Sequence, residues 1–187
     1  MVRVFSCILI VALLQSCCYR GLKSSYGFPR KDISKKVLLK QGSIDGVDTK
    51  HLYVEKYILT NIGKKINVLK ENGSSFLKFY PSGKVSSFPL VNTTEYNELI
   101  PNYQFKKSDF DPRKSFMGYY YLKEGAINML GVHFAECNAR NIPSKITVKG
   151  DTLFVRSRKY GQQNLGTKVY VKSDIPVGFL EGWEPDW

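Results

Sequence analysis

The residue types that perform acid–base, nucleophilic or metal chemistry are sparse in this chain and form no recognised catalytic pattern. The two histidines, His51 and His133, are separated by most of the sequence. His133, Glu136 and Cys137 would converge on a metal ion only on a helix, whereas the surrounding pattern predicts the end of a strand. The sequence contains no Gly-x-Ser-x-Gly nucleophile motif and no glycine-rich phosphate loop. We therefore expect a protein that is not an enzyme and that uses no metal ion or cofactor.

Aromatic residues, at 13% of the chain, are the stronger lead. Three consecutive tyrosines, Tyr119, Tyr120 and Tyr121, must send side chains to both faces of a strand. A small β-barrel either fills its interior with such side chains or encloses a cavity for an apolar ligand. If a cavity exists, we expect Tyr103, Phe105 and Tyr120 near its entrance as ligand-binding residues. The alternative is a filled interior, in which half-buried tyrosines need no ligand.

Most of the chain after residue 50 alternates between apolar and polar residues, which predicts short strands in hairpin order. The alternating segments are 51–60, 65–70, 75–80, 84–90, 116–123, 126–134, 145–149, 152–158 and 167–172. Turn signals stand between several of them, at Asn72-Gly73, Pro81-Ser82-Gly83, Glu124-Gly125 and Gly150-Asp151. Strict alternation on both sides of the last turn places four residues in the core: Ile146, Val148, Leu153 and Val155. The same pattern predicts that Ile66 and Val68 point inward.

About eight such strands predict an all-β protein, an antiparallel meander closed as a small barrel. Closure removes the two unpaired edges that an open meander would expose. A β-sandwich is the alternative, because periodicity cannot distinguish one closed sheet from two packed sheets. The long connection Val91–Ser115 is expected to carry one short helix over Glu95–Leu99 and to form a lid across one end of the sheet.

The order of elements between about residues 50 and 172 resembles that of small lipocalin-like barrels, which occur among exported bacterial lipoproteins. This resemblance implies a barrel that binds a small ligand. The Gly-x-Trp motif of lipocalins is absent, since Trp183 and Trp187 lie in the C-terminal tail. Residues 76–85, F-L-K-F-Y-P-S-G-K-V, are similar to one unit of the MORN-type hairpin repeats.

The N-terminus has the pattern of an export signal. Arg3 precedes the apolar run Val4–Leu14, which is too short to span a bilayer. The run ends in Leu14-Gln15-Ser16-Cys17, which resembles a bacterial lipobox and departs from it at Gln15. The resemblance implies that residues 1–16 form a removed signal peptide and that Cys17 is the lipid attachment site, carrying palmitate or a related acyl chain. The alternative is an ordinary cleaved secretory signal.

Residues 17–36 are rich in Gly, Ser and Lys, with one Pro, and show no apolar period. We predict that they form the lipidated N-terminus and a flexible tether, followed by a single β-rich domain over residues 37–187.

The 28 Lys and Arg against 16 Asp and Glu give the chain a net charge of +12. This charge suits anionic lipid headgroups or acidic partners, and no RNA-binding signature accompanies it, so we expect no nucleic-acid partner. One hypothesis is a non-catalytic lipoprotein of the bacterial cell envelope, expected at the outer membrane, that binds a small apolar ligand or lipid in its barrel. The other is a filled structural subunit that docks on an envelope protein through its basic face. A secreted protein is the alternative localisation. A cavity of roughly 300 Å³ or more would favour the first hypothesis.

Overall fold

The structure is a computed structural model. It describes residues 21–31, 44, 46–67, 75–89, 91, 100–135, 138–157 and 166–187, without the side chains of residues 134, 135 and 138. Cys17, the turn at Asn72-Gly73 and the predicted helix over Glu95–Leu99 lie outside these residues. The predictions made for them are therefore untested.

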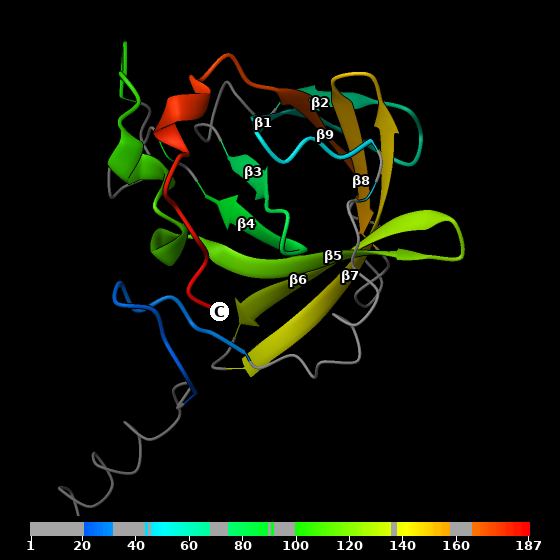
Figure 1. Ribbon diagram of the computed structural model, residues 1–187. Coiled ribbons are helices and arrows are strands. Elements are labelled where there is room, and N and C mark those ends of the chain that lie inside the picture. Colours follow the sequence, from blue (N-terminus) through cyan, green and yellow to red (C-terminus); the bar gives the residue numbers. More distant parts are fainter. Residues whose placement is uncertain are drawn as a thin grey trace, which may run out of the picture.

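The domain is an antiparallel β-barrel, as predicted, and short 3₁₀ turns are the only helical elements among the described residues. Its strands are β1 (Leu52–Leu59), β2 (Lys65–Asn67), β3 (Phe76–Phe79), β4 (Lys84–Phe88), β5 (Phe116–Lys123), β6 (Ala126–Ala135), β7 (Asn138–Lys149), β8 (Thr152–Ser157) and β9 (Thr167–Lys172). Each strand from β3 to β8 pairs with the next one in the sequence, and β9 pairs with β1. This last pairing closes the sheet, which excludes the sandwich alternative (Figure 1).

Strands β2 and β3 share one edge of β1. β3 pairs with residues 52–54 of β1, and β2 pairs with residues 57–59. The wall is therefore eight strands around, and β2 forms an additional hairpin with the end of β1.

Tight turns join the strands at one end of the barrel. Glu124 and Gly125 both have positive φ (53° and 70°), as a two-residue type I′ hairpin turn requires. Gly83 (φ 77°) closes the Pro81-Ser82-Gly83 turn, and Gly150 (φ 55°) lies in the β7–β8 turn, so these turn predictions are confirmed. Strands β4, β6 and β8 end, and β5, β7 and β9 begin, at the other end.

The end with the tight turns, the packed end, is filled by side chains. Tyr53 and Phe79 meet edge to face at 5.9 Å between ring centroids, and Phe79 meets Tyr120 in the same way at 5.1 Å. Ile146 and Leu153 pack against them, which confirms the predicted core face of the β7–β8 hairpin. The aromatic residues thus fill one half of the interior.

The outer wall of β1, β3 and β4 is buried as well. Leu52, Val54, Phe76 and Phe88 point outward and are covered by residues of the long connection and of the C-terminal tail, including Phe105, Phe110, Phe179 and Leu180. We call these two segments, residues 100–115 and 175–180, the outer cover. Its regular parts are the 3₁₀ turns η3 (Lys107–Phe110), η4 (Pro112–Lys114) and η5 (Val177–Phe179). The described part of the long connection therefore lies along the barrel wall rather than across an end.

Residues 21–31, which we call the strap, form a small hairpin docked on the domain, with Lys23 bridged to Pro29. Arg30 is 4% exposed, donates hydrogen bonds to the carbonyl oxygens of Pro112 and Ser115, and pairs with Asp186 at 2.8 Å. Within the predicted tether over residues 17–36, the strap therefore packs against the domain through a buried guanidinium, while the division of the chain into tether and domain stays a prediction.

Two further expectations are corrected by the register. Ile66 lies on β2 and is 48% exposed, because β2 extends beyond the closed wall and has no interior to face. β7 begins at Asn138 rather than near Lys145 and runs through Pro143. Proline is tolerated there because the described pairing with β8 begins only at Ser144.

Among the described residues, no helix has the length and apolar character needed to span a membrane.

Candidate functional site

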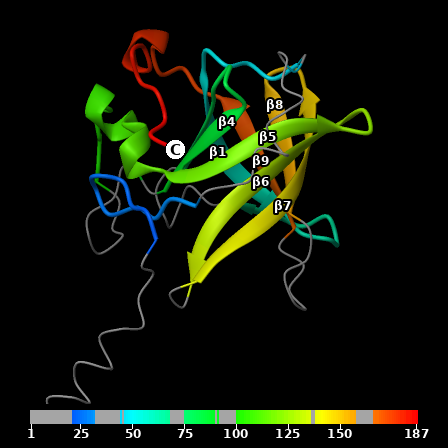
Figure 2. The same cartoon turned by 60° about the horizontal axis from the view of Figure 1, so that its bottom comes forward.

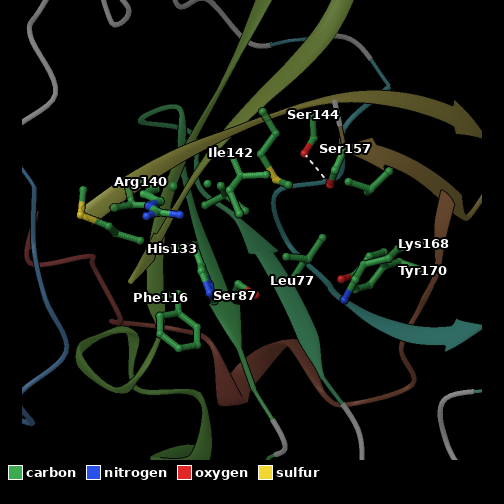
Figure 3. A pocket seen from close by; sticks show the side chains of 17 residues that line it. Leu77, Ser87, Phe116, His133, Arg140, Ile142, Ser144, Ser157, Lys168 and Tyr170 are labelled. Atoms are coloured by element: carbon green, nitrogen blue, oxygen red, sulfur yellow. Dashed lines mark hydrogen bonds between the residues drawn. The ribbon is translucent and has the colours of Figure 1, made fainter. Parts of the chain in front are cut away.

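The half of the barrel opposite the packed end encloses a cavity of about 560 Å³, and we call this half the open end (Figure 3). Its lining side chains come from seven of the strands that form the wall. The lining residues are Leu77, Val85, Ser87, Phe116, Met117, Gly118, Met129, Gly131, Val132, His133, Arg140, Ile142, Ser144, Val155, Ser157, Lys168 and Tyr170.

The cavity exists because the inward positions at this level carry small residues. Gly118 of β5 and Gly131 of β6 are cross-strand partners, so this part of the wall has no side chain in the interior. Ser144 of β7 pairs with Ser157 of β8, and their hydroxyl oxygens lie 3.1 Å apart. At the packed end, the same strands contribute Tyr120, Ile146 and Leu153 instead. The change from large to small inward residues along the strands turns a filled core into a cavity.

The walls of the cavity are mainly apolar. Leu77, Val85 and Val155 belong both to the buried core and to the lining, so the core forms the floor. Met129 and Ile142 complete the wall between β6 and β7. Apolar walls around a closed floor bind a ligand by removing its apolar surface from water.

Three of the polar lining residues are basic and lie toward the mouth. His133 and Arg140 are cross-strand partners on β6 and β7, and the His133 ring lies 6.4 Å from that of Phe116. Lys168 stands on the opposite side, on β9 (Figure 3). None of the described lining residues is acidic. The mouth therefore favours a ligand whose polar end is neutral or negatively charged.

Glu55 lies behind Lys168 and balances its charge. One carboxylate oxygen, Oε2, accepts hydrogen bonds from the Ser75 hydroxyl (2.6 Å), the Lys168 ammonium (3.0 Å) and the Tyr170 hydroxyl (3.2 Å). The other oxygen, Oε1, is buried without a hydrogen-bond partner among the described residues. Burial, assisted by the Glu55 charge, raises the pKa of the Tyr170 hydroxyl well above its usual value. Tyr170 therefore stays neutral and donates a hydrogen bond to the Glu55 carboxylate.

None of the three predicted ligand-binding residues lines this cavity. The Tyr103 hydroxyl donates a hydrogen bond to Asp109 at 2.8 Å, and Phe105 packs edge to face on Phe76, so both lie in or beside the outer cover. Tyr120 fills the packed end, where its hydroxyl donates to the carbonyl oxygen of Tyr80 at 2.8 Å. Whether any of them binds a ligand is untested, but the structure does not bring them together at the cavity.

Sequence reasoning missed the residues that do line the cavity. The usable signal was a set of small residues at inward positions of the strands, above all Gly118 and Gly131. Arg140 was overlooked because the strand around it was not predicted. His133 was considered as a metal ligand with Glu136 and Cys137, which lie outside the described residues. Within the described part of the chain, no cluster of three or more potential metal ligands occurs.

Comparison of the chain with models of known protein families and with the sequences of curated proteins finds no match. The function must therefore be argued from the site itself.

Proposed function

We propose that this protein is a non-catalytic binding protein that holds one small amphipathic or apolar molecule in the open end of its barrel. The observation that carries the proposal is the cavity of about 560 Å³, apolar in its walls and closed at one end by the core. This volume lies within the range of about 300–1,000 Å³ found for small-molecule sites. The filled-barrel alternative has less support, because the interior is filled only at the packed end.

The lining also defines the kind of ligand. An apolar body fits against Leu77, Met129 and Ile142, away from water. A polar or acidic end group fits at the mouth, beside Arg140 and His133. A single-chain amphiphile such as a fatty acid has both parts, and the cavity orients it with the chain inward.

We further propose that the protein is a lipid-anchored component of the bacterial envelope, exposed at the outer membrane, with a secreted form as the alternative. This part rests on the sequence, on the apolar run Val4–Leu14 and on the lipobox-like residues that end in Cys17. A ligand-binding barrel tethered to a membrane has a lipid source within reach.

The cavity is tested by filling it. A Cβ atom on Gly131 would meet only the carbonyl oxygen of Ile142, at 3.9 Å, so Gly131→Leu places a side chain in the cavity without a backbone clash. Binding is measured in solution with N-phenyl-1-naphthylamine, an apolar probe that fluoresces when it leaves water, and with its displacement by a fatty acid. Gly178→Leu is the matched control, because Gly178 lies in the tail with open space around it.

We expect the wild type and Gly178→Leu to bind the probe equally and Gly131→Leu to bind at least tenfold more weakly while unfolding at a similar denaturant concentration. Equal binding by all three proteins would place the probe elsewhere and would contradict the proposal. Absence of probe binding by the wild type would contradict it as well.

A further inference from the structure

The turn between β1 and β2 presents an apolar side chain to solvent. Ile62, at its tip, is 87% exposed, and Ile66 on β2 is 48% exposed. The turn is ordered by two backbone hydrogen bonds, from the Thr60 amide to the Lys64 carbonyl oxygen (2.9 Å) and from the Gly63 amide to the Thr60 carbonyl oxygen (3.0 Å). Lys64 and Lys65 follow at once and are exposed. The turn therefore holds an apolar tip beside two positive charges.

This turn belongs to the open end of the barrel. β1 runs from the packed end, so its last residues and the turn that follows lie level with the cavity mouth, near Thr167 at the start of β9. Figure 2 shows the teal β1–β2 hairpin and the tip of β6 and β7 on the same, lower side of the molecule. The β1–β2 turn and the cavity mouth thus lie at the same end of the barrel.

The described residues at the two ends of the barrel differ in how their charges are paired. Around the mouth, the described strand ends and the β1–β2 turn carry Lys64, Lys65, Arg140 and Lys168, and their one acidic side chain, Glu55, is buried and paired with Lys168. At the packed end, acidic groups accompany the basic ones: Lys172 pairs with both Asp48 (3.1 Å) and Asp151 (2.7 Å), and Lys123 lies 3.8 Å from Glu124. Among the described residues, Lys123 and Lys172 at the packed end therefore have acidic partners, whereas Lys64 and Lys65 of the β1–β2 hairpin have none.

The strap brings the N-terminal part of the chain to the same end. The Arg30 amide donates to the Leu22 carbonyl oxygen, so Gly21 lies beside the base of the strap, and the Lys31 ammonium donates to Asn141 at the projecting end of β7. Cys17 precedes Gly21 by four residues, which span at most about 14 Å. A lipid attached at Cys17, as proposed above, would be limited to that reach from Gly21.

We propose that the open end of the barrel is a membrane-binding surface that docks on an anionic lipid bilayer, with Ile62 inserted among the lipids and Lys64 and Lys65 at the headgroups. An exposed apolar residue flanked by lysines is suited to this interface, since it joins apolar burial to attraction by anionic lipids. The surface is independent of the cavity, although docking would place the mouth against the lipid. The occupant is a bilayer, because the described part of this surface combines the positive charges of Lys64 and Lys65 with the projecting apolar side chain of Ile62.

The test compares two exposed apolar residues at opposite ends of the barrel. Leu122, near the β5–β6 turn, is 49% exposed and serves as the matched control for Ile62. Ile62→Trp and Leu122→Trp variants of the full protein, purified from its host, are mixed with vesicles of equal parts phosphatidylethanolamine and phosphatidylglycerol whose acyl chains carry bromine. Bromine quenches tryptophan fluorescence only at close range. The wild type supplies the background from Trp183 and Trp187.

We expect at least twofold stronger quenching in Ile62→Trp than in the wild type, and no increase over the wild type in Leu122→Trp. The double variant Lys64→Glu, Lys65→Glu, built on Ile62→Trp, should lose most of the added quenching. Equal quenching at both positions, or failure of the protein to bind these vesicles, would overturn the proposed surface. These outcomes leave probe binding in solution unaffected, so failure here is distinguishable from failure of the ligand-binding proposal.

Discussion

Gly118 and Gly131 face each other across β5 and β6, yet the space around them differs. A Cβ atom on Gly118 would lie 2.8 Å from Val85 Cγ1 and 3.1 Å from the carbonyl oxygen of Leu130. A Cβ atom on Gly131 would instead project into the cavity, with only the carbonyl oxygen of Ile142 nearby, at 3.9 Å. One glycine therefore permits close packing of the wall, and the other leaves the interior open.

This difference predicts opposite effects of the same substitution. Gly118→Ala should lower the free energy of unfolding by about 1–3 kcal/mol, because Val85 and the wall must move. Gly131→Ala should leave it unchanged or raise it by about 0.4–1 kcal/mol, since alanine restricts the unfolded chain. Urea denaturation of the two variants measures both values. Equal losses at both positions would show that the interior at Gly131 is already filled.

At the scale of single residues, the sequence did not indicate which side chains line the cavity. Tyr103, Phe105 and Tyr120 were chosen for their chemical type, but aromatic side chains serve the outer cover and the packed end here. Gly118 and Gly131 carry no side chain, and they are important because they place no side chain in the interior of the barrel. Such positions become visible only when the cross-strand partners are known.

At the scale of elements, the alternating sequence of the β7–β8 hairpin directly indicates which of its residues lie in the core. Ile146 faces Val155, and Val148 faces Leu153, across a turn at Gly150-Asp151. Ile146→Ala or Leu153→Ala should cost about 2–5 kcal/mol of stability, because each removes a fully buried side chain. Lys145→Ala, on the outer face, should cost almost nothing. Thermal and urea unfolding provide the measurement, and similar small effects at Lys145 and Ile146 would contradict the assigned faces.

Alternation predicted the strands and several of their faces, but not what lies outside them. Leu52 and Val54 are as well buried as the inward-facing Tyr53, because the outer cover packs on them. The first three residues of β1 are thus buried on both faces of the strand. The partners of its outer face come from residues more than 50 positions away, and no local pattern indicates them. The order and closure of the strands, in contrast, follow from hairpin turns between neighbours and from the need to remove free edges.

At the scale of the whole molecule, the proposed anchor has a direct test. We expect the mature protein purified from its host to begin at Cys17 and to carry a covalent lipid, seen by intact mass spectrometry as a loss of residues 1–16 and a gain of acyl mass. Cys17→Ser should abolish the acyl mass and release the protein from membranes when the signal is removed. Cys18→Ser is the matched control and should leave both unchanged. An unmodified residue 17 in the wild type would establish the secreted alternative.

The seam between β1 and β9 joins the first strand of the barrel to the last, and the contact between Arg30 and Asp186 joins the two ends of the chain in the same way. During synthesis, the N-terminal residues leave the ribosome first, so β1 waits for its partner until more than 100 further residues have been made. Throughout that interval the growing meander has an unpaired edge at β1 that can pair with other chains. The risk that the free edge of β1 pairs with other chains is therefore set by the time needed to make β9, and not by the stability of the finished barrel. It ends only when β9 has been made and the barrel closes.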